Sequence, residues 1–306
     1  MINFKKGIFL PLILINSFGF IQPSKAEFSM PACPTSGTKT YSELLSLTED
    51  PNEFECLGTP EKYEITIYEM GLCTSSTSPI IGSSGSKIWD KSTCVPTMSS
   101  GINGTKVDLA PGNSTEKIAP LPSSDNRPSS GNYKYAYILI SSEFKLKGSY
   151  ELSDGTTYYS KQGEDSYGPF GDADKTLSSA QEHGEEVDNI GSGEGGWSVA
   201  GAAEMSSPFD MSGGKMSALL LNNCNHVTNS CNKISSKPSN QESVSKLLAI
   251  FEPTKDGVSD PIRITDETQG IEVKLVVKDG GYLIAGNSSD IEFFGSAPFR
   301  PQITSF

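Results

Sequence analysis

The sequence predicts a mainly β protein: an antiparallel β-sandwich, one large or two small, that is disulfide-bonded and carries a long Gly/Ser/acid-rich loop. Hydrophobic and polar residues alternate with a period of two in several short segments, as in strands with one buried face. Polar, glycine- and proline-rich stretches separate these segments, as turns do. Helical periodicity never persists, which argues against a helical bundle.

The N-terminus has the three parts of a secretory signal peptide. Lys5 and Lys6 form a positive end, and residues 7–21 form an apolar run. Ser24 and Ala26 then place small side chains at the −3 and −1 positions for cleavage after Ala26. The apolar run is shorter than the roughly 20 residues that span a bilayer, so we expect no transmembrane segment in the mature chain. The mature protein is then secreted, periplasmic or held at the cell surface.

The charge of the mature chain excludes some partners. Cleavage removes three lysines (Lys5, Lys6 and Lys25) and no acidic residue, which moves the formal net charge from −13 to −16. Such a surface repels nucleic acid and anionic lipid headgroups. No basic patch is present, and we predict no nucleic-acid partner.

Six cysteines would reach a compartment in which disulfides persist. Sequence alone does not choose among their pairings, and we predict pairing between neighbours because each pair flanks one short loop. The alternative is a metal site, but no Cys-x-x-Cys occurs and the two histidines do not complete a zinc pattern. The predicted pairs are Cys33–Cys56, Cys73–Cys94 and Cys224–Cys231.

Residues 27–160 are predicted to form an N-terminal β-sandwich domain with a disulfide-tethered lead-in. A short helix should begin with Thr40 or Ser42 as N-cap and Glu43 in its first turn. The turn Ser153-Asp154-Gly155 joins the last two predicted strands as a hairpin. Strands are expected at residues 63–70, 106–109, 133–140, 144–152 and 156–160, the third being apolar on both faces as a central strand would be.

Residues 161–215 are interpreted as a polar loop or insertion, with a short helix expected at 177–183. Regular alternation returns in residues 216–306, the C-terminal β region. The turn Asp279-Gly280-Gly281 predicts that the last two strands form a hairpin. Strands are expected at residues 216–221, 247–251, 261–265, 271–277 and 282–285.

Part of the first domain resembles a known class of module. The segment YEITIYEMGL (63–72), the short KVDLA, the pair Leu121-Pro122, and Gly131-Asn132-Tyr133 leading into YAYILI carry the resemblance. Together they resemble prealbumin-type or carboxypeptidase-regulatory-like β-sandwich modules of bacterial surface proteins, over residues 63–160. In those modules the connection between Leu-Pro and Gly-x-Tyr is usually tighter. The resemblance implies an accessory, non-catalytic domain.

Two motifs have spacings known from enzymes. Residues 191–196 match G-x-G-x-x-G, but Glu194 adds negative charge where a phosphate would lie, so we interpret them as a flexible loop. Around Ser198 the sequence resembles a nucleophile elbow, with alanine in place of its last glycine. The candidate bases are His183 and His226. An extracellular hydrolase is therefore the least favoured hypothesis.

Acidic and aromatic residues suggest a binding module as an alternative. Glu164, Asp165, Asp172 and Asp174 could supply oxygen ligands to calcium, although Leu177 stands where an EF-hand needs glycine. Aromatic residues such as Tyr158 and Tyr159 could stack on sugars, but aromatic residues in strands more often belong to the core.

These observations favour a secreted or cell-surface structural or adhesive protein without catalytic activity. Its expected partners are copies of itself, other surface proteins or glycans, because sandwich edge strands allow assembly by strand addition. The alternative is a secreted glycan- or calcium-binding module. We predict no cofactor, and calcium is the ligand that the alternative would require.

Overall fold

A computed structural model describes residues 30–48, 50–75, 80–81, 87–88, 91–110, 126–163, 171–186, 209–211, 213–225, 230–233 and 245–306. The predicted signal peptide, residues 1–26, lies outside them. The protein is mainly β, its strands pair antiparallel, and it carries disulfide bonds, as predicted. In the described part of the chain, no helix is long and apolar enough to cross a bilayer.

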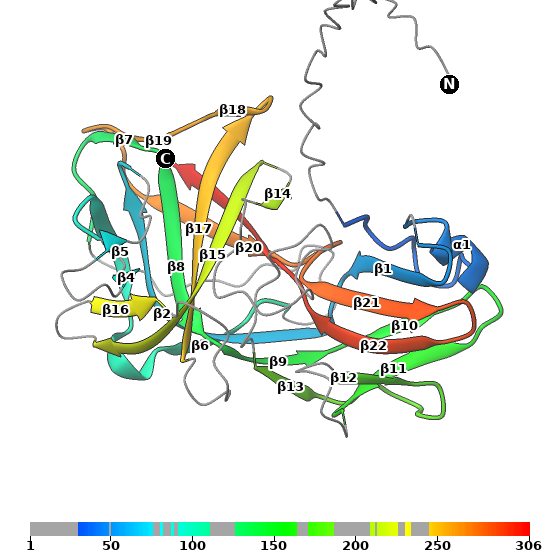
Figure 1. Ribbon diagram of the computed structural model, residues 1–306. Coiled ribbons are helices and arrows are strands. Elements are labelled where there is room, and N and C mark those ends of the chain that lie inside the picture. Colours follow the sequence, from blue (N-terminus) through cyan, green and yellow to red (C-terminus); the bar gives the residue numbers. More distant parts are fainter. Residues whose placement is uncertain are drawn as a thin grey trace, which may run out of the picture.

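A six-stranded sheet occupies one end of the molecule (Figure 1). Its edge strands come from the first half of the chain, while two of its central strands come from the last fifth. In order, its strands are β1 (Glu53–Gly58), β21 (Tyr282–Asn287), β22 (Ile291–Ser296), β12 (Gly171–Asp174), β11 (Thr157–Lys161) and β10 (Ser149–Glu151).

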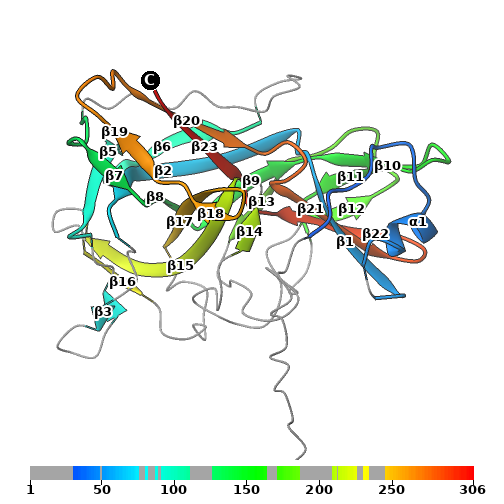
Figure 2. The ribbon, with the colours of Figure 1, turned by 90° about the horizontal axis from the view of Figure 1, so that it is seen from above.

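A larger, 13-stranded sheet extends from beside the six-stranded sheet, where β9 and β13 lie, to the other end of the molecule, where β16 and β3 lie (Figure 2). In order, its main path is β13 (His183–Glu186), β9 (Glu143–Lys147), β2 (Lys62–Cys73), β8 (Tyr135–Ser141), β17 (Lys246–Lys255), β15 (Gly214–Asn225), β16 (Ser230–Lys233), β4 (Lys87–Ile88) and β3 (Ile80–Ile81). The remaining strands pair with members of this path: β5 (Cys94–Ser99) and β6 (Thr105–Asp108) with β2, β14 (Phe209–Met211) with β15, and β18 (Val258–Ser259) with β17.

Two ribbons of two strands pack against the larger sheet. One consists of β7 (Gly131–Tyr133) and β19 (Ile262–Ile264), and the other of β20 (Ile271–Val276) and β23 (Arg300–Ser305). Side chains of the first ribbon share a cluster with Leu72 and Ala136 of the larger sheet. An apolar pocket lies between the larger sheet and the second ribbon, lined by side chains that include Met70, Ile138, Met216, Leu275 and Ile303.

One hydrophobic core connects the two ends of the molecule. Strand β2 begins beside β9, near the six-stranded sheet, and ends between β5 and β8 in the larger sheet. Its Tyr63 packs edge-on against Phe299, with ring centroids 6.2 Å apart. The same buried cluster includes Tyr282 and Phe294, which stack at 5.2 Å, and Ile140 of β8. The two ends therefore share buried apolar surface.

The lead-in before α1 (Tyr41–Leu45) covers both edges of the six-stranded sheet. At one edge, the Cys33 N–H donates to the Leu57 carbonyl over 2.7 Å. At the other edge, the Gly37 N–H donates to the Glu151 carbonyl over 2.7 Å. The Cys33–Cys56 disulfide fastens this segment to β1. Because an uncovered edge strand can pair with another chain, the lead-in protects this sheet from association.

Many of the predicted elements form as expected. Thr40 caps α1 in a capping box with Glu43. The hairpin around Gly155 forms between β10 and β11, with Gly155 at φ +85°. Strand β8 is buried on both faces and lies between β2 and β17. Strands β2, β6, β15, β17 and β19 fall on the other predicted segments.

Three predicted local structures are wrong. Residues 144–152 form two strands in place of one, because β9 joins the larger sheet and β10 the six-stranded sheet. Residues 177–182 form no helix, and His183 begins strand β13, because Gln181 and Ser160 hold the segment extended through backbone and side-chain hydrogen bonds. The predicted hairpin of residues 271–277 with 282–285 also does not form. Strand β20 pairs with β23 and β21 pairs with β1 and β22, since the intervening turn carries the chain from the ribbon to the six-stranded sheet.

Two predicted disulfides are confirmed, Cys33–Cys56 and Cys73–Cys94. Cys224 lies on β15 and Cys231 on β16, and these strands pair antiparallel. Their side chains lie outside the described part of the structure, so the third pair stays a prediction. Segments 27–160 and 216–306 both contribute strands to each of the two large sheets.

Candidate functional site

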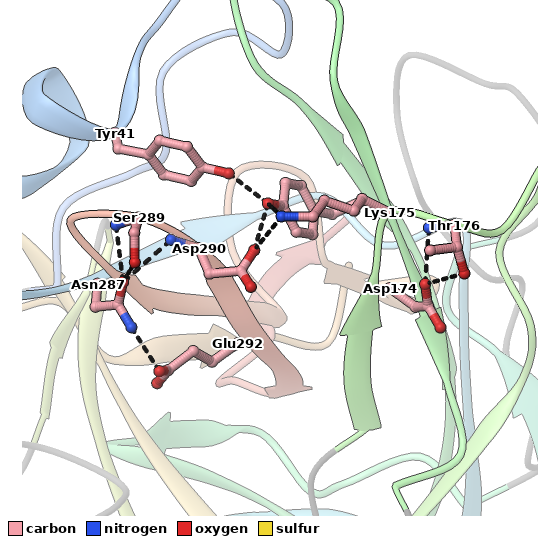
Figure 3. Close-up of polar contacts among 9 residues, drawn as sticks. Tyr41, Asp174, Lys175, Thr176, Asn287, Ser289, Asp290 and Glu292 are labelled. Carbon is pink, nitrogen blue, oxygen red and sulfur yellow. Dashed lines mark hydrogen bonds and ion pairs between the residues drawn. The ribbon is translucent and has the colours of Figure 1, made fainter.

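Four polar side chains from different elements meet at the outer end of the six-stranded sheet (Figure 3). Tyr41 comes from α1, Tyr158 from β11, Lys175 from the turn after β12, and Asp290 from the turn between β21 and β22. We call this group the Tyr41–Asp290 cluster. Its members approach one another only in the folded chain, so the cluster is the candidate site.

Helix α1 positions Tyr41 through its N-terminal cap. The Thr40 N–H donates to the Glu43 carboxylate over 3.0 Å, and the Glu43 N–H donates to the Thr40 hydroxyl over 3.4 Å. This reciprocal pair satisfies backbone groups that a helix start leaves free. The Tyr41 ring then meets the Tyr158 ring edge-on, with centroids 6.4 Å apart.

The turn between β21 and β22 positions Asp290 through Asn287. The Asn287 side-chain oxygen accepts from the Ser289 and Asp290 N–H groups over 2.8 and 3.1 Å. The Asn287 N–H donates to the Asp290 carbonyl over 2.9 Å. Asparagine favours such turns because its side chain can bond its own backbone a few residues on. The turn thereby holds the Asp290 carboxylate toward Lys175 (Figure 3) and within hydrogen-bond reach of the Tyr158 hydroxyl.

The hydroxyl groups form a directed chain of hydrogen bonds. Tyr158 donates its one hydroxyl hydrogen to the Asp290 carboxylate. Tyr41 therefore donates to the Tyr158 oxygen, since a phenol carries a single donor. The Lys175 ammonium lies 3.3 Å from the Tyr158 oxygen and 3.4 Å from the Asp290 carboxylate. The positive charge of Lys175 thus stabilises the Asp290 carboxylate, which is the last acceptor in this series of hydrogen bonds.

The electrostatics of the cluster favour hydrogen bonding over nucleophilic chemistry. Burial raises the pKa of Tyr158, and the hydrogen bond to Asp290 raises it further. Burial and the bond to Tyr158 likewise raise the pKa of Tyr41. Both phenols stay protonated at neutral pH and act as donors. Asp290 and Lys175 remain about half exposed and can offer a charged acceptor and donor to a partner.

The acidic residues proposed for calcium do not all fall in the described residues. Asp174 uses its carboxylate within the protein: it accepts from the Thr176 N–H and hydroxyl over 2.7 and 2.6 Å, and pairs with Lys161 at 3.2 Å. The hydrogen bonds from Thr176 lower its pKa. Asp172 lies two residues earlier on β12, whereas Glu164 and Asp165 lie outside the described part of the chain. Calcium binding stays a prediction.

Among the described residues, no group of three or more His, Cys, Asp or Glu side chains is placed to hold a metal ion.

The aromatic residues proposed for sugar stacking separate by strand face. Tyr158 is 1% exposed and belongs to the core, whereas its neighbour Tyr159 is half-buried. The interpretation of strand aromatics as core residues is therefore confirmed for Tyr158.

Compared with known proteins, the chain matches no family model, no curated sequence and no solved structure. The resemblance of residues 63–160 to surface-protein sandwich modules therefore stays a prediction.

The histidine proposed as a hydrolase base is fully buried. His183 is 0% exposed on β13, and burial lowers its pKa to about 4. Ser198 and His226, the other two members of that hypothesis, lie outside the described residues. His183 therefore belongs to the interior of the fold.

A second polar cluster, on one face of the larger sheet, has no counterpart in the sequence predictions. The Tyr137 hydroxyl donates to the Glu69 carboxylate over 2.6 Å, and the Lys91 ammonium pairs with the same carboxylate. Lys246 lies 3.6 Å above the centre of the Tyr68 ring, and burial lowers its pKa to about 8. Glu69 and Lys246 are 7% and 5% exposed, although charged residues are rarely buried unless they have a partner.

The sequence carries a recognisable signal for only some residues of the Tyr41–Asp290 cluster. Asn287-Ser-Ser-Asp290 between two strands indicates a turn with an asparagine cap. Lys175 follows Asp174 in a polar stretch, and no local pattern distinguishes it from other surface lysines. Its role depends on strands that meet from distant parts of the chain.

Proposed function

We propose that the mature chain is a secreted or cell-surface structural protein with an adhesive role, and that it catalyses no reaction. The observation that carries the proposal is the lead-in, which covers both edges of the six-stranded sheet and is fastened there by the Cys33–Cys56 disulfide. Disulfides persist in oxidising compartments, which agrees with export of the chain. A protein that must stay folded and separate outside the cell benefits from such protection.

The hydrogen bonds of the Tyr41–Asp290 cluster support a structural role, because its polar groups contact one another within the protein. In the Tyr41–Asp290 cluster, hydroxyl, carboxylate and ammonium groups join a helix, a strand and two turns. Their pKa shifts keep the phenols protonated, which leaves the cluster without an activated nucleophile. We interpret the cluster as a fastening between elements.

The larger sheet offers a candidate surface for presentation. Strands β17 and β18 form a hairpin whose turn residues Asp256 and Gly257 have φ values of +53° and +76°. Positive φ at both central residues is typical of a tight two-residue hairpin turn. Next to it, Val258 is 70% exposed. The hairpin projects from the top of the molecule in the view of Figure 1, and we propose that it contacts a partner there.

Fractionation of the native cells tests the proposal. We expect a mature chain that begins at Glu27, occurs in the extracellular, periplasmic or surface fraction, and shows no titratable thiols after denaturation. Deleting the gene should reduce attachment of the cells to surfaces. A full-length chain in the cytosol with free thiols would contradict the export, and unchanged attachment with correct localisation would contradict the adhesive role.

A further inference from the structure

Strand β13 places two ionisable side chains where a strand normally places apolar ones. It pairs with β9 so that His183 lies opposite Leu146 and Glu185 lies opposite Phe144. Leu146 and Phe144 face the core, and His183 and Glu185 therefore share that face. The structure confirms this, since His183 is 0% and Glu185 5% exposed.

Glu185 is held by one residue of the six-stranded sheet. Its carboxylate accepts from the Ser296 N–H over 2.6 Å and from the Ser296 hydroxyl over 2.7 Å. These two bonds favour the charged form, but burial dominates and raises the pKa of Glu185 to about 8. The ionisable groups that interact with it from other strands are the buried phenols of Tyr63 on β2 and Tyr282 on β21. No positive side chain is recorded against this carboxylate among the described residues.

His183 is also held without a charged partner on its own face. Its ring fits against Gly171 of β12, where an added Cβ would lie 2.5 Å from the ring. Its Nε2 lies 3.5 Å from the Tyr282 hydroxyl, and its Nδ1 has no hydrogen-bond partner among the described residues. Burial lowers its pKa to about 4, although the nearby Glu182 acts in the opposite direction.

The charges on the outer side of this region are already paired. Glu182 contacts Lys62 at 2.5 Å and Lys145 at 3.2 Å, and Lys147 pairs with Glu61 at 3.5 Å. Glu61 also acts on Tyr282 through its charge. These groups are at least partly exposed, so their pairing contributes little to the free energy of docking and is screened by salt. The pH response of β13 should therefore come from its two buried side chains.

Apart from these two side chains and the bonds between Gln181 and Ser160 just before it, β13 has few contacts that hold it in place. It ends the larger sheet and pairs with β9 alone among the described strands. On its other side, the Gly184 N–H donates to the Gln162 side chain over 2.9 Å. Its sequence, His-Gly-Glu-Glu, contains no residue that favours strands. Docking of this strand thus depends strongly on the state of His183 and Glu185.

We propose that β13 is a pH-sensitive switch, docked on the core while His183 and Glu185 are both uncharged and released in alkaline medium when Glu185 ionises. A released β13 would uncover the edge of β9 and the core face beneath Glu185. Because an uncovered strand edge can pair with another chain, release changes what the surface can bind. The switch is independent of the proposed adhesive role.

The two groups act in opposite directions, which fixes the pH window. The pKa of Glu185 rises on docking from its usual 4.5 to about 8, so docking weakens as the pH rises through this range. The pKa of His183 falls from its usual 6.5 to about 4, so docking weakens as the pH falls from 6.5 to 4. Between pH 4.5 and 6.5 the effects cancel. Above pH 6.5 only the loss from Glu185 remains.

Amide hydrogen exchange of the full mature protein tests the switch. The measured quantity is the protection factor of the β13 amides, which corrects for the intrinsic effect of pH on exchange. We expect a plateau between pH 4.5 and 6.5, then a fall of about tenfold per pH unit up to pH 8. The variant Glu185→Gln should keep its protection above pH 6.5, since glutamine retains bonds to Ser296 and carries no charge.

Two further variants keep the test decisive if Glu185→Gln does not fold. His183→Asn should remove the plateau, so that protection begins to fall near pH 4.5. Glu182→Gln, the exposed neighbour, is the matched control and should follow the wild type. A wild-type protection factor that stays constant from pH 6.5 to 8, or a His183→Asn profile identical to that of the wild type, would overturn the proposal.

Discussion

At the scale of single residues, Tyr158 connects the core to the surface. Its ring is buried against Tyr41, while its hydroxyl reaches the half-exposed Asp290. A buried tyrosine needs a partner for its hydroxyl, because leaving that group unpaired costs free energy. Here the partner is a carboxylate, and hydrogen bonds to charged groups are stronger than neutral ones.

Replacing Tyr158 with phenylalanine should lower the free energy of unfolding by about 1–2 kcal/mol. The change removes the hydroxyl that links Tyr41 to Asp290 and keeps the ring. Tyr159→Phe is the matched control, because Tyr159 lies on the opposite face of the same strand, and it should change the free energy by less than about 0.5 kcal/mol. Urea unfolding followed by circular dichroism measures both. Equal effects of the two changes would contradict the role given to the cluster.

Residue positions show how far alternation predicts a site. The period of two placed Ile65 and Ile67 in the core correctly. Glu69 is in phase with Ile65 and Ile67, but the rule names no partner for its carboxylate, and the rule gives no reason to bury Glu185. The structure buries both carboxylates beside hydrogen-bond donors from other strands. Those donors, Tyr137 and Ser296, are distant in sequence. Buried polar residues are therefore found only when the pairing of strands is known.

At the scale of elements, local turns were predictable and distant pairings were not. The hairpin of β10 and β11 follows from its Asp-Gly turn, because its two strands are neighbours in sequence. The segment between β20 and β21 carries a similar signal, with Asp279 at φ +50° and Gly281 at φ +69°. Yet the Asp279 N–H donates to the Thr59 hydroxyl, and this contact directs the chain toward β1. A turn motif in the sequence therefore does not determine which strand pairs with the strand that follows it.

The two confirmed disulfides allow two effects to be separated: the loop-closure entropy that either bond removes from the unfolded chain, and the covering of the β1 edge by the lead-in. They join residues 23 and 21 apart in sequence, so removing either should cost a similar loop-closure entropy, about 2–4 kcal/mol. Cys33–Cys56 alone also fastens the lead-in over β1. We therefore expect the variant with serine at positions 33 and 56 to associate more than the wild type at high concentration, and the variant with serine at 73 and 94 to associate no more than the wild type.

Analytical ultracentrifugation and urea unfolding measure these two effects separately. Both double variants should lose stability to a similar degree. The protective role of the lead-in would be refuted by equal association of the two variants, or by none in either.

At the scale of the whole molecule, the shared core predicts cooperative unfolding. Phe299 is 5% exposed and packs on Tyr63, in a cluster that includes Phe294 at one end and Leu220 at the other. Both sheets contain strands from the N-terminal and the C-terminal parts of the chain, and these meet where β1 pairs with β21 and where β8 pairs with β17. The fold class was predictable because it follows from the alternation of apolar and polar residues within each strand. The mixing of N-terminal and C-terminal strands was not, because it depends on pairing between strands that are distant in sequence.

Phe299→Ala should lower the stability of both ends together, by about 3–5 kcal/mol, because it removes a large buried ring from their common core. Scanning calorimetry should show a single transition, shifted to lower temperature, whose calorimetric and van't Hoff enthalpies agree. Two separate unfolding transitions, of which the substitution shifts only one, would show that the two ends unfold independently.

The place of β1 beside β21 has a consequence for the order of events during synthesis. Glu53 pairs with Asn287, and Gly58 pairs with Tyr282. The six-stranded sheet thus lacks two of its central strands until the ribosome has made the last tenth of the chain. Such long-range pairing is slow to form. The six-stranded sheet of a nascent chain therefore stays incomplete until synthesis is nearly finished, and the proposed export would act on a chain in which this sheet has not yet closed.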